Sequence, residues 1–169
     1  MKKIAFFLFL FQALSIFSQE VIIGDTSVKA LEEKPYSNWY LERYQSFSSK
    51  KGVINELSEY IKNEDFTVEV YFGSWCSDSK REVPKLIKIL EEADFDFSNL
   101  RLIGVDSDKI VPGISEKERQ RLNITNVPTI IVYQDNKEIN RFVEYAQESL
   151  EEDLLKIFSK KPYKHSYKF

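Results

Sequence analysis

The sequence predicts a single α/β domain in which helices cover both faces of a central, mixed β-sheet. Three observations carry this prediction. Segments rich in β-branched and aromatic residues alternate with segments whose apolar residues recur at helical spacing. The last two strand segments are separated by a short turn and followed by a final helical segment. The chain has 169 residues, 43% of them hydrophobic, which is enough for one ordinary core and too few for two comfortable ones.

Composition excludes several classes of function. The formal charge is −3 and both signs are mixed along the chain, so the basic surface that nucleic-acid binding requires is not indicated. Five Gly and five Pro, with no repeat or low-complexity segment, argue against a solenoid or a disordered protein. His165 is the only histidine, and the chain has no glycine-rich phosphate loop. We therefore expect no metal site and no cofactor.

The first stretch, MKKIAFFLFLFQALSIFSQE, has the layout of a secretory signal peptide. Two lysines precede an apolar run over residues 4–17, and the small Ser18 follows it. A membrane anchor is the alternative, but the run is interrupted by Gln12 and is shorter than the roughly 20 residues of a spanning helix. We expect removal of residues 1–18 and no stable membrane insertion afterwards. The protein is then exported, to the periplasm in a Gram-negative host and otherwise to the medium.

The first half of the chain predicts two helices and then a strand that leads into a third helix. Residues 35–47 carry aromatic side chains at near-helical spacing, with Pro35 suited to the first turn, and we expect this stripe to serve packing. Residues 53–62 place their apolar side chains on one helical face. Residues 66–72, FTVEVYF, alternate as a strand does, and they run directly into Gly73 and the next helix.

The second half repeats the alternation of strands and helices. Ser115 and Ser149 each precede a helical segment and have a glutamate three residues later, which is the capping-box pattern. Strands are expected over residues 100–106, 129–133 and 138–145, the last two forming a hairpin around QDNK.

The only cysteine, Cys76, lies where the strand of residues 66–72 passes into a helix. A lone cysteine cannot form an internal disulfide, so a free thiol in an exported protein is either buried or used. A free cysteine taken at random packs more often as a small, inert hydrophobe. The neighbours Ser74, Ser77 and Asp78 are polar, however, so we expect the thiol of Cys76 to reach solvent.

Several motifs resemble those of the thioredoxin superfamily. WCSDS matches the Trp-Cys-x-x-Cys site of that family through its first cysteine, and Pro84 lies where thioredoxins carry the proline of the active-site helix. NVPTIIVY is similar to the family's cis-proline loop, which makes Pro128 the cis-proline candidate. NRFVEYAQESLEEDLLKIF resembles the closing hairpin and helix of a bacterial thioredoxin-like subgroup. The resemblance covers residues 53–159, which leaves a helical amino-terminal extension over residues 19–52 and a basic tail over residues 160–169.

The chain departs from the family pattern at three positions. Ser79 replaces the second, resolving cysteine. Val70 lies where thioredoxins have the buried acid that assists proton transfer, and the adjacent Glu69 falls on the other face of an alternating strand. Glu144 replaces the glycine that usually faces the site, so we expect a differently shaped substrate groove.

The resemblance implies monothiol thiol-disulfide exchange. Cys76 is the expected nucleophile, because backbone N–H groups and the helix dipole stabilise a thiolate at a helix amino terminus. Ser79 is expected to donate a hydrogen bond to that thiolate, but it cannot resolve a mixed disulfide. The expected partners are protein or small-molecule thiols and disulfides together with an external thiol reductant, in isomerisation or mixed-disulfide reduction. The expected substrate groove comprises Trp75, Ser77, Asp78, Val127, Pro128 and Thr129.

Three alternatives remain open at this point. The sequence SKRE, from Ser79, is itself a capping box, so the helix could begin at Lys80 and leave Cys76 in the preceding loop. The tail over residues 160–169 has the composition of either a solvated, frayed end or a docking strip. The whole domain could be a non-catalytic binding module that keeps the peptide groove, because a fold does not by itself define a function.

Overall fold

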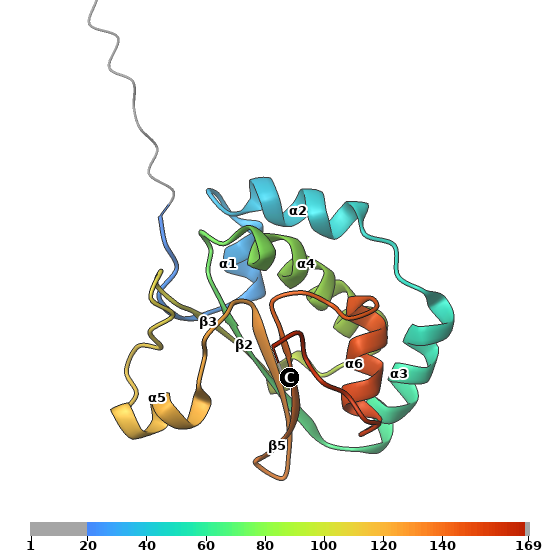
Figure 1. Ribbon diagram of the computed structural model, residues 1–169. Coiled ribbons are helices and arrows are strands. Elements are labelled where there is room, and N and C mark those ends of the chain that lie inside the picture. Colours follow the sequence, from blue (N-terminus) through green and yellow to red (C-terminus); the bar gives the residue numbers. More distant parts are fainter. Residues whose placement is uncertain (1–19, 168–169) are drawn as a thin grey trace, which may run out of the picture.

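A five-stranded mixed sheet with the order β1-β3-β2-β4-β5 forms the centre of the protein (Figure 1). The structure is a computed structural model that describes residues 20–167, so the predicted signal peptide lies outside the described residues. β2 and β3 run parallel, and the other neighbouring pairs are antiparallel. The strands are β1 (Gly24–Thr26), β2 (Phe66–Phe72), β3 (Leu100–Gly104), β4 (Thr129–Gln134) and β5 (Lys137–Val143). The mixed sheet flanked by helices confirms the predicted fold class.

In the part of the chain that the structure describes, six helices and one short 3-10 turn pack around this sheet. They are α1 (Val28–Glu32), α2 (Ser37–Ser46), α3 (Lys51–Asn63), α4 (Ser77–Glu92), η1 (Phe97–Asn99), α5 (Glu116–Leu122) and α6 (Leu150–Phe158). Pro35 was expected in the first turn of the second of these helices; it instead precedes that helix and follows a cis peptide bond. Within residues 20–167, no helix combines the length and the apolar character needed to cross a lipid bilayer.

The predicted capping and turn chemistry is present. The Ser115 hydroxyl accepts a hydrogen bond from the backbone N–H of Glu118 at 3.2 Å, and Ser149 caps α6 in the same way. The β4-β5 hairpin turns through Asp135 and Asn136, which have φ of 51° and 58°. Consecutive left-handed residues match the right-handed twist of the strands they connect, which explains why Asp and Asn lie at this turn.

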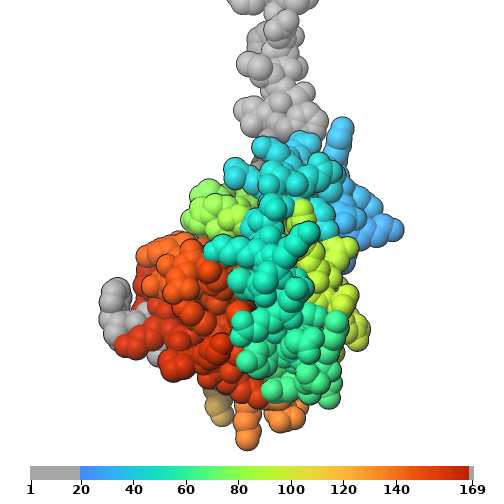
Figure 2. All heavy atoms as spheres, turned by 90° about the vertical axis from the view of Figure 1, so that its right-hand side faces the viewer, coloured from blue at the N-terminus to red at the C-terminus, as the bar shows by residue number. Residues whose placement is uncertain are grey.

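The sheet buries its two faces unequally. Val68, Val70 and Phe72 point from β2 into the larger hydrophobic core, which helices α2, α3, α4 and α6 cover. Figure 2 shows the α2–α3 segment as a continuous band over this side, next to α6. The smaller core lies on the opposite face, where Tyr71 and Ile131 pack with Leu122 of α5. One short helix, α5, packs on this face, whereas helices α1, α2, α3, α4 and α6 all contribute to the core on the other.

The thinly covered face leaves a cavity of about 430 Å³ between β2, β3, β4 and α5. Its polar lining includes Glu69, Tyr71, Arg101 and Tyr133. The Tyr71 hydroxyl donates a hydrogen bond to Glu69 at 2.7 Å, and Arg101 pairs with the same carboxylate at 3.2 Å. No predicted site residue lines this cavity, so the candidate site lies elsewhere.

The amino-terminal extension is not purely helical, which corrects the prediction for residues 19–52. Its strand β1 pairs antiparallel with β3 and widens the sheet by one strand. The pairing requires a close backbone approach, because a Cβ atom on Gly104 would lie 2.3 Å from the carbonyl oxygen of Ile22. Asp25 then pairs with Arg101 of β3 at 2.7 Å. A segment of three residues forms a strand only when another strand, here β3, lies beside it, so β1 was not visible in the sequence.

Candidate active site

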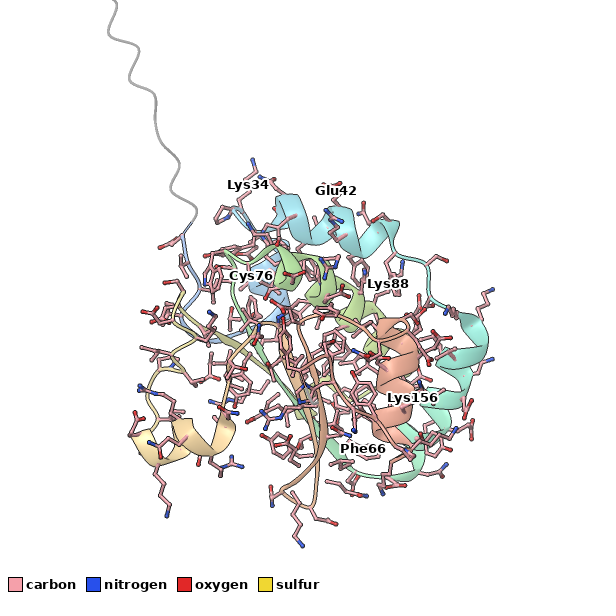
Figure 3. All side chains as sticks on the ribbon, in the orientation of Figure 1. Lys34, Glu42, Phe66, Cys76, Lys88 and Lys156 are labelled. Atoms are coloured by element: carbon pink, nitrogen blue, oxygen red, sulfur yellow. The ribbon has the colours of Figure 1, made fainter. Side chains whose placement is uncertain are left out.

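Cys76 lies at the junction of β2 and α4. It is the N-cap residue of α4, with φ −83° and ψ 130°, and the helix begins at Ser77. The alternative in which Ser79 caps a helix that begins at Lys80 is therefore wrong. Figure 3 labels Cys76 at the amino-terminal end of α4, at the opposite end of the sheet from Phe66, where β2 begins. The strand delivers the cysteine to the helix end that carries free backbone N–H groups.

The thiol is half-buried and faces a second loop. Its Sγ donates a hydrogen bond to the carbonyl oxygen of Val127 at 3.4 Å, and the side chain packs at the edge of the smaller core. The Val127–Pro128 peptide bond is cis, and Pro128 is buried. Thr129 completes this loop by donating its hydroxyl proton to the carbonyl oxygen of Asn126 at 2.7 Å. The structure thus brings the two predicted halves of the site, more than fifty residues apart, into contact.

Ser79 is fully buried in the first turn of α4. Its Oγ accepts a hydrogen bond from the backbone N–H of Gly73 at 3.1 Å, which ties the helix to the loop that precedes Cys76. This contact satisfies a buried backbone donor and gives the serine a structural role. The expected hydrogen bond from Ser79 to a Cys76 thiolate stays a prediction.

Trp75 covers the loop before the cysteine. Its indole Nε1 donates a hydrogen bond to the carbonyl oxygen of Val105 at 3.0 Å, so the ring spans from the β2 end to the β3 end. The ring also lies against Gly73, where an added Cβ atom would be 2.6 Å from the indole. Any side chain at position 73 would displace the tryptophan. The sequence shows Gly73 and Trp75, but only the packing of the indole against Gly73 explains why a glycine lies at position 73.

The extension also supports this loop. The Ser74 hydroxyl accepts a hydrogen bond from the backbone N–H of Ile22 at 3.0 Å, and Ser74 is 1% exposed. From the polarity of Ser74 the sequence predicts solvent near the cysteine, and it gives no sign of this contact with the extension. The residue is polar because it binds the backbone of the extension, while exposed Ser77 is the neighbour that reaches solvent.

Asp78 turns along the helix and not toward the cysteine. Its carboxylate pairs with Arg81 at 2.6 Å, and Arg81 also contacts the buried Glu82 at 2.5 Å. Val70, in the place of the family's buried acid, is fully buried and apolar. The carboxylate of Glu69 is used by Tyr71 and Arg101 on the other face of the sheet. Glu69, the acid considered for proton transfer, and Asp78 on α4 therefore both bind partners other than the thiol.

Glu144 is bonded to the cis-proline loop through both its backbone and its side chain. Its backbone N–H donates to the carbonyl oxygen of Pro128 at 2.7 Å, and its φ of 65° lies in the left-handed region that a glycine adopts most easily. Its carboxylate accepts hydrogen bonds from Asn126, at 3.2 Å, and from the hydroxyl of Tyr167. The predicted departure at this position therefore brings a charged side chain to the groove.

The carboxy-terminal tail is docked through residue 167, so the interpretation of residues 160–169 as a frayed end is wrong for the described part. Tyr163 is buried; its hydroxyl donates to Asp153 at 3.0 Å, and its carbonyl accepts from Asn140 at 3.0 Å. Tyr167 packs edge-to-face on Tyr145. The tail thereby adds Tyr167 to the surroundings of the site, which no motif signalled.

A cysteine at a strand-to-helix junction that faces a cis-proline loop defines a thiol protein with a thioredoxin-like fold. The family model described as Thioredoxin matches residues 50–156, which is more than half of the chain. The chain belongs to the thioredoxin family. Membership indicates a thiol-disulfide redox function for the domain.

Individual relatives agree with this assignment. The chain is 27% identical to Thioredoxin Asp f 28 of Aspergillus fumigatus over 89 residues, which cover 53% of this chain and 74% of the relative. It is 26% identical to a thioredoxin of Chlamydia trachomatis over 90 residues, which cover 53% of this chain and 76% of that protein. An HIV epitope-scaffold protein shares the fold, with a TM-score of 0.60 at 18% identity over 83% of this chain and 95% of the scaffold.

Proposed function

We propose that the protein is an exported thiol-disulfide exchange protein that acts through Cys76 alone. The single observation that carries the proposal is the position of the thiol: Cys76 is the N-cap of α4, partly exposed, and its Sγ contacts the Val127 carbonyl of the cis-proline loop. Backbone N–H groups at a helix amino terminus stabilise a thiolate, which is the nucleophile in disulfide exchange. The family supports the redox class.

The proposed reaction has two exchange steps. The Cys76 thiol first loses its proton, and the thiolate attacks one sulfur of a substrate disulfide; a bond from Sγ to that sulfur forms, the substrate disulfide breaks, and the other sulfur leaves as a thiolate. In the second step a thiolate from outside the chain attacks the substrate sulfur and releases Cys76. If that thiolate belongs to the substrate, the disulfide is isomerised without net oxidation. If it belongs to a separate thiol, a disulfide between that thiol and the attacked substrate sulfur is released, the other substrate sulfur stays reduced, and Cys76 is a thiolate again.

Ser79 explains why the second step needs an outside thiol. It occupies the position of a resolving cysteine, but its hydroxyl cannot form a disulfide. Its buried Oγ instead accepts the Gly73 N–H bond that holds the loop. The chain therefore keeps the attacking group and the architecture of the site while the resolving group is absent from it.

The experiment that tests this proposal compares the reactivity of Cys76 in the folded protein with its reactivity in the unfolded chain. Cys76 is the only cysteine, so mixed-disulfide formation with bis(2-hydroxyethyl) disulfide at neutral pH is followed by mass, once in buffer and once in denaturant. We expect the folded protein to react about tenfold faster than the unfolded chain, because folding presents the sulfur to helix N–H groups. A Cys76→Ser variant sets the background. A folded thiol that reacts more slowly than the unfolded one would contradict the proposal.

A binding module is the second candidate, and one observation favours it. Val70 and the orientation of Glu69 leave the described structure without a carboxylate directed at the thiol, which thioredoxins use for proton transfer. Under this alternative the groove beside Pro128 still holds an extended peptide, and the thiol stays inert in the experiment above. The comparison of folded with unfolded reactivity therefore separates the two candidates.

Export is the other part of the proposal. Its support is the pattern of residues 1–18, two lysines followed by an apolar run and a small residue. An oxidising compartment also supplies the disulfides on which a monothiol exchange protein acts. The periplasm is proposed for a Gram-negative host and secretion for any other.

A further inference from the structure

We propose that Glu144 determines the substrate specificity of the groove, and that its carboxylate favours disulfides with a positively charged group next to the reacting sulfur over those with a negative one. The inference rests on the proposed function, because it concerns the substrates that reach Cys76. It is carried by the position, orientation and charge of Glu144.

The position of Glu144 follows from a chain of direct contacts. The Cys76 Sγ touches the carbonyl of Val127 at 3.4 Å, and the next residue, Pro128, accepts the backbone N–H of Glu144 at 2.7 Å. The left-handed φ of 65° turns the chain immediately after β5 ends at Val143. Glu144 is therefore bonded to the same cis-proline loop that the Cys76 sulfur contacts, one residue further along that loop.

Two neutral donors hold the carboxylate in place. Asn126 donates from its side-chain amide at 3.2 Å, and the Tyr167 hydroxyl donates from the docked tail. The hydrogen bond to Glu144, with smaller contributions from burial, raises the pKa of Tyr167 to about 12. The tyrosine consequently keeps its proton at neutral pH and remains a hydrogen-bond donor to Glu144.

The charge of Glu144 differs in its partners from that of Asp78, the acid on the α4 side. Among the residues that the structure describes, Glu144 forms no ion pair with a lysine, arginine or histidine. Asp78, the acid on the α4 side, pairs with Arg81 at 2.6 Å, so its charge is largely balanced. The negative charge of Asp78 also acts on the Tyr167 hydroxyl, which places the two acids around the same tyrosine. A cation on a substrate would meet in Glu144 an anion whose partners within residues 20–167 are the neutral donors Asn126 and Tyr167.

The size of the effect follows from Coulomb's law. One partly solvated charge within several ångströms of an incoming charge changes local concentration and rate by about threefold to tenfold, and added salt reduces the effect. We define the charge ratio as the rate constant of Cys76 with cystamine, which carries ammonium groups, divided by that with 3,3′-dithiodipropionate, which carries carboxylates. The same ratio measured on the unfolded chain corrects for the intrinsic reactivity of the two reagents.

The experiment compares the charge ratio of the natural protein with those of Glu144→Gln, Glu144→Lys and Glu59→Gln. Glutamine keeps the size of the side chain and an acceptor for Asn126 and Tyr167 but removes the charge. Glu59 lies exposed on α3, remote from Cys76, so Glu59→Gln matches the change in net charge without touching the groove. We expect Glu144→Gln to lower the ratio by about threefold to tenfold, Glu144→Lys to lower it further, and Glu59→Gln to leave it as it was.

Each outcome decides the inference. A ratio that is unchanged in both Glu144 variants, while the neutral bis(2-hydroxyethyl) disulfide still reacts, overturns the role of Glu144 and leaves the proposed function standing. An equal fall of the charge ratio in Glu59→Gln assigns the effect to the net charge of the protein and also overturns the role of Glu144. If Cys76 of the natural protein reacts with none of the three reagents, the proposed function fails and the inference fails with it. Circular dichroism shows whether each variant is folded, and either of the two Glu144 variants suffices for the test.

Discussion

The Cys76 thiol donates a hydrogen bond to the carbonyl oxygen of Val127 across 51 residues of sequence, at 3.4 Å. This bond joins the start of α4 to the cis-proline loop. A thiolate has no proton to donate, so ionisation ends the bond and leaves the sulfur beside the helix N–H groups. The contact with Val127 therefore belongs to the protonated thiol.

Replacing Ser79 with cysteine should create a working dithiol site. Residues three apart in the first turn of a helix lie close enough for a disulfide, and Ser79 already lies in that turn beside the Cys76 loop. We expect Ser79→Cys to gain reduction of insulin with a dithiol as reductant, while the natural protein accumulates mixed disulfides.

The matched control for this variant is Ser77→Cys, which adds a cysteine directly after Cys76, where the two side chains diverge along the helix. It should show no gain in insulin reduction. If Ser79→Cys also confers no turnover, the groove itself does not support catalysis, and the binding-module alternative replaces the proposed function.

Replacing Ser79 with alanine should lower the free energy of unfolding. The buried N–H of Gly73 then loses the Oγ that accepts its hydrogen bond, and an unsatisfied buried donor costs about 1–3 kcal/mol. Urea denaturation measures the change. Ser77→Ala, at an exposed position of the same turn, should change the stability by no more than about 0.5 kcal/mol. Equal free energies of unfolding for the two variants would show that the Ser79–Gly73 hydrogen bond does not stabilise the fold.

Two glycine substitutions should have opposite effects. A Cβ atom at Gly104 would lie 2.3 Å from the carbonyl oxygen of Ile22, and backbone cannot move aside cheaply, so Gly104→Ala should cost about 1–3 kcal/mol of stability. The cost should appear with faster proteolysis near residues 20–26, because β1 detaches from β3. Gly52 has nothing within 4 Å and lies in α3, so Gly52→Ala should add about 0.4–1 kcal/mol. A neutral Gly104→Ala would mean that β1 does not pair with β3 in solution.

The buried Asp153 should make stability fall as pH rises. Burial raises the pKa of Asp153 above its ordinary value, although its hydrogen bonds with Gln147, Tyr163 and Glu148 act in the opposite direction. The folded carboxyl therefore binds its proton more tightly than the unfolded one. The stability it contributes is complete below the ordinary carboxyl pKa of about 3.9 and is lost as pH rises through the raised value.

Asp153→Asn cannot ionise at this position, so it does not share the loss of stability. From pH 4 up to the raised pKa of Asp153, the free energy of unfolding of the variant should therefore rise relative to that of the natural protein. Urea denaturation at a series of pH values measures this difference. Asp135→Asn, in the exposed β4-β5 turn, should follow the natural protein in parallel. A difference between the natural protein and Asp153→Asn that is constant with pH would contradict the assignment.

Export should be visible at the amino terminus of the protein. Sequencing of the exported form is expected to begin at or near Gln19, because the small Ser18 suits the residue before the cleavage site. Leu10→Arg interrupts the apolar run and should leave the full-length form inside the cell. An intact Met1 form of the natural protein in the membrane fraction would show that the segment is an anchor.

Short-range chemistry accounts for what could be predicted about the fold. Ser115 and Ser149 cap their helices as expected, and β2 runs from Phe66 to Phe72 as its alternation indicated. These features depend on hydrogen bonds and side-chain periods within a few residues, which a sequence displays directly. The strand β1 could not be predicted in this way, because three residues form a strand only when β3 lies beside them.

The same division runs through the candidate site. Cys76, its place before a helix, and the substitution of Ser79 for a resolving cysteine were determined by the sequence alone, since each depends on residue identity and local spacing. The partners of these residues were decided by the tertiary structure: Val127 against the thiol, Gly73 against Ser79, and Tyr167 against Glu144. Such contacts join segments that are distant in the chain, and no local pattern encodes which buried donor will meet which acceptor when the sheet and helices pack. The sequence therefore specified the candidate nucleophile, and packing specified the residues that surround it.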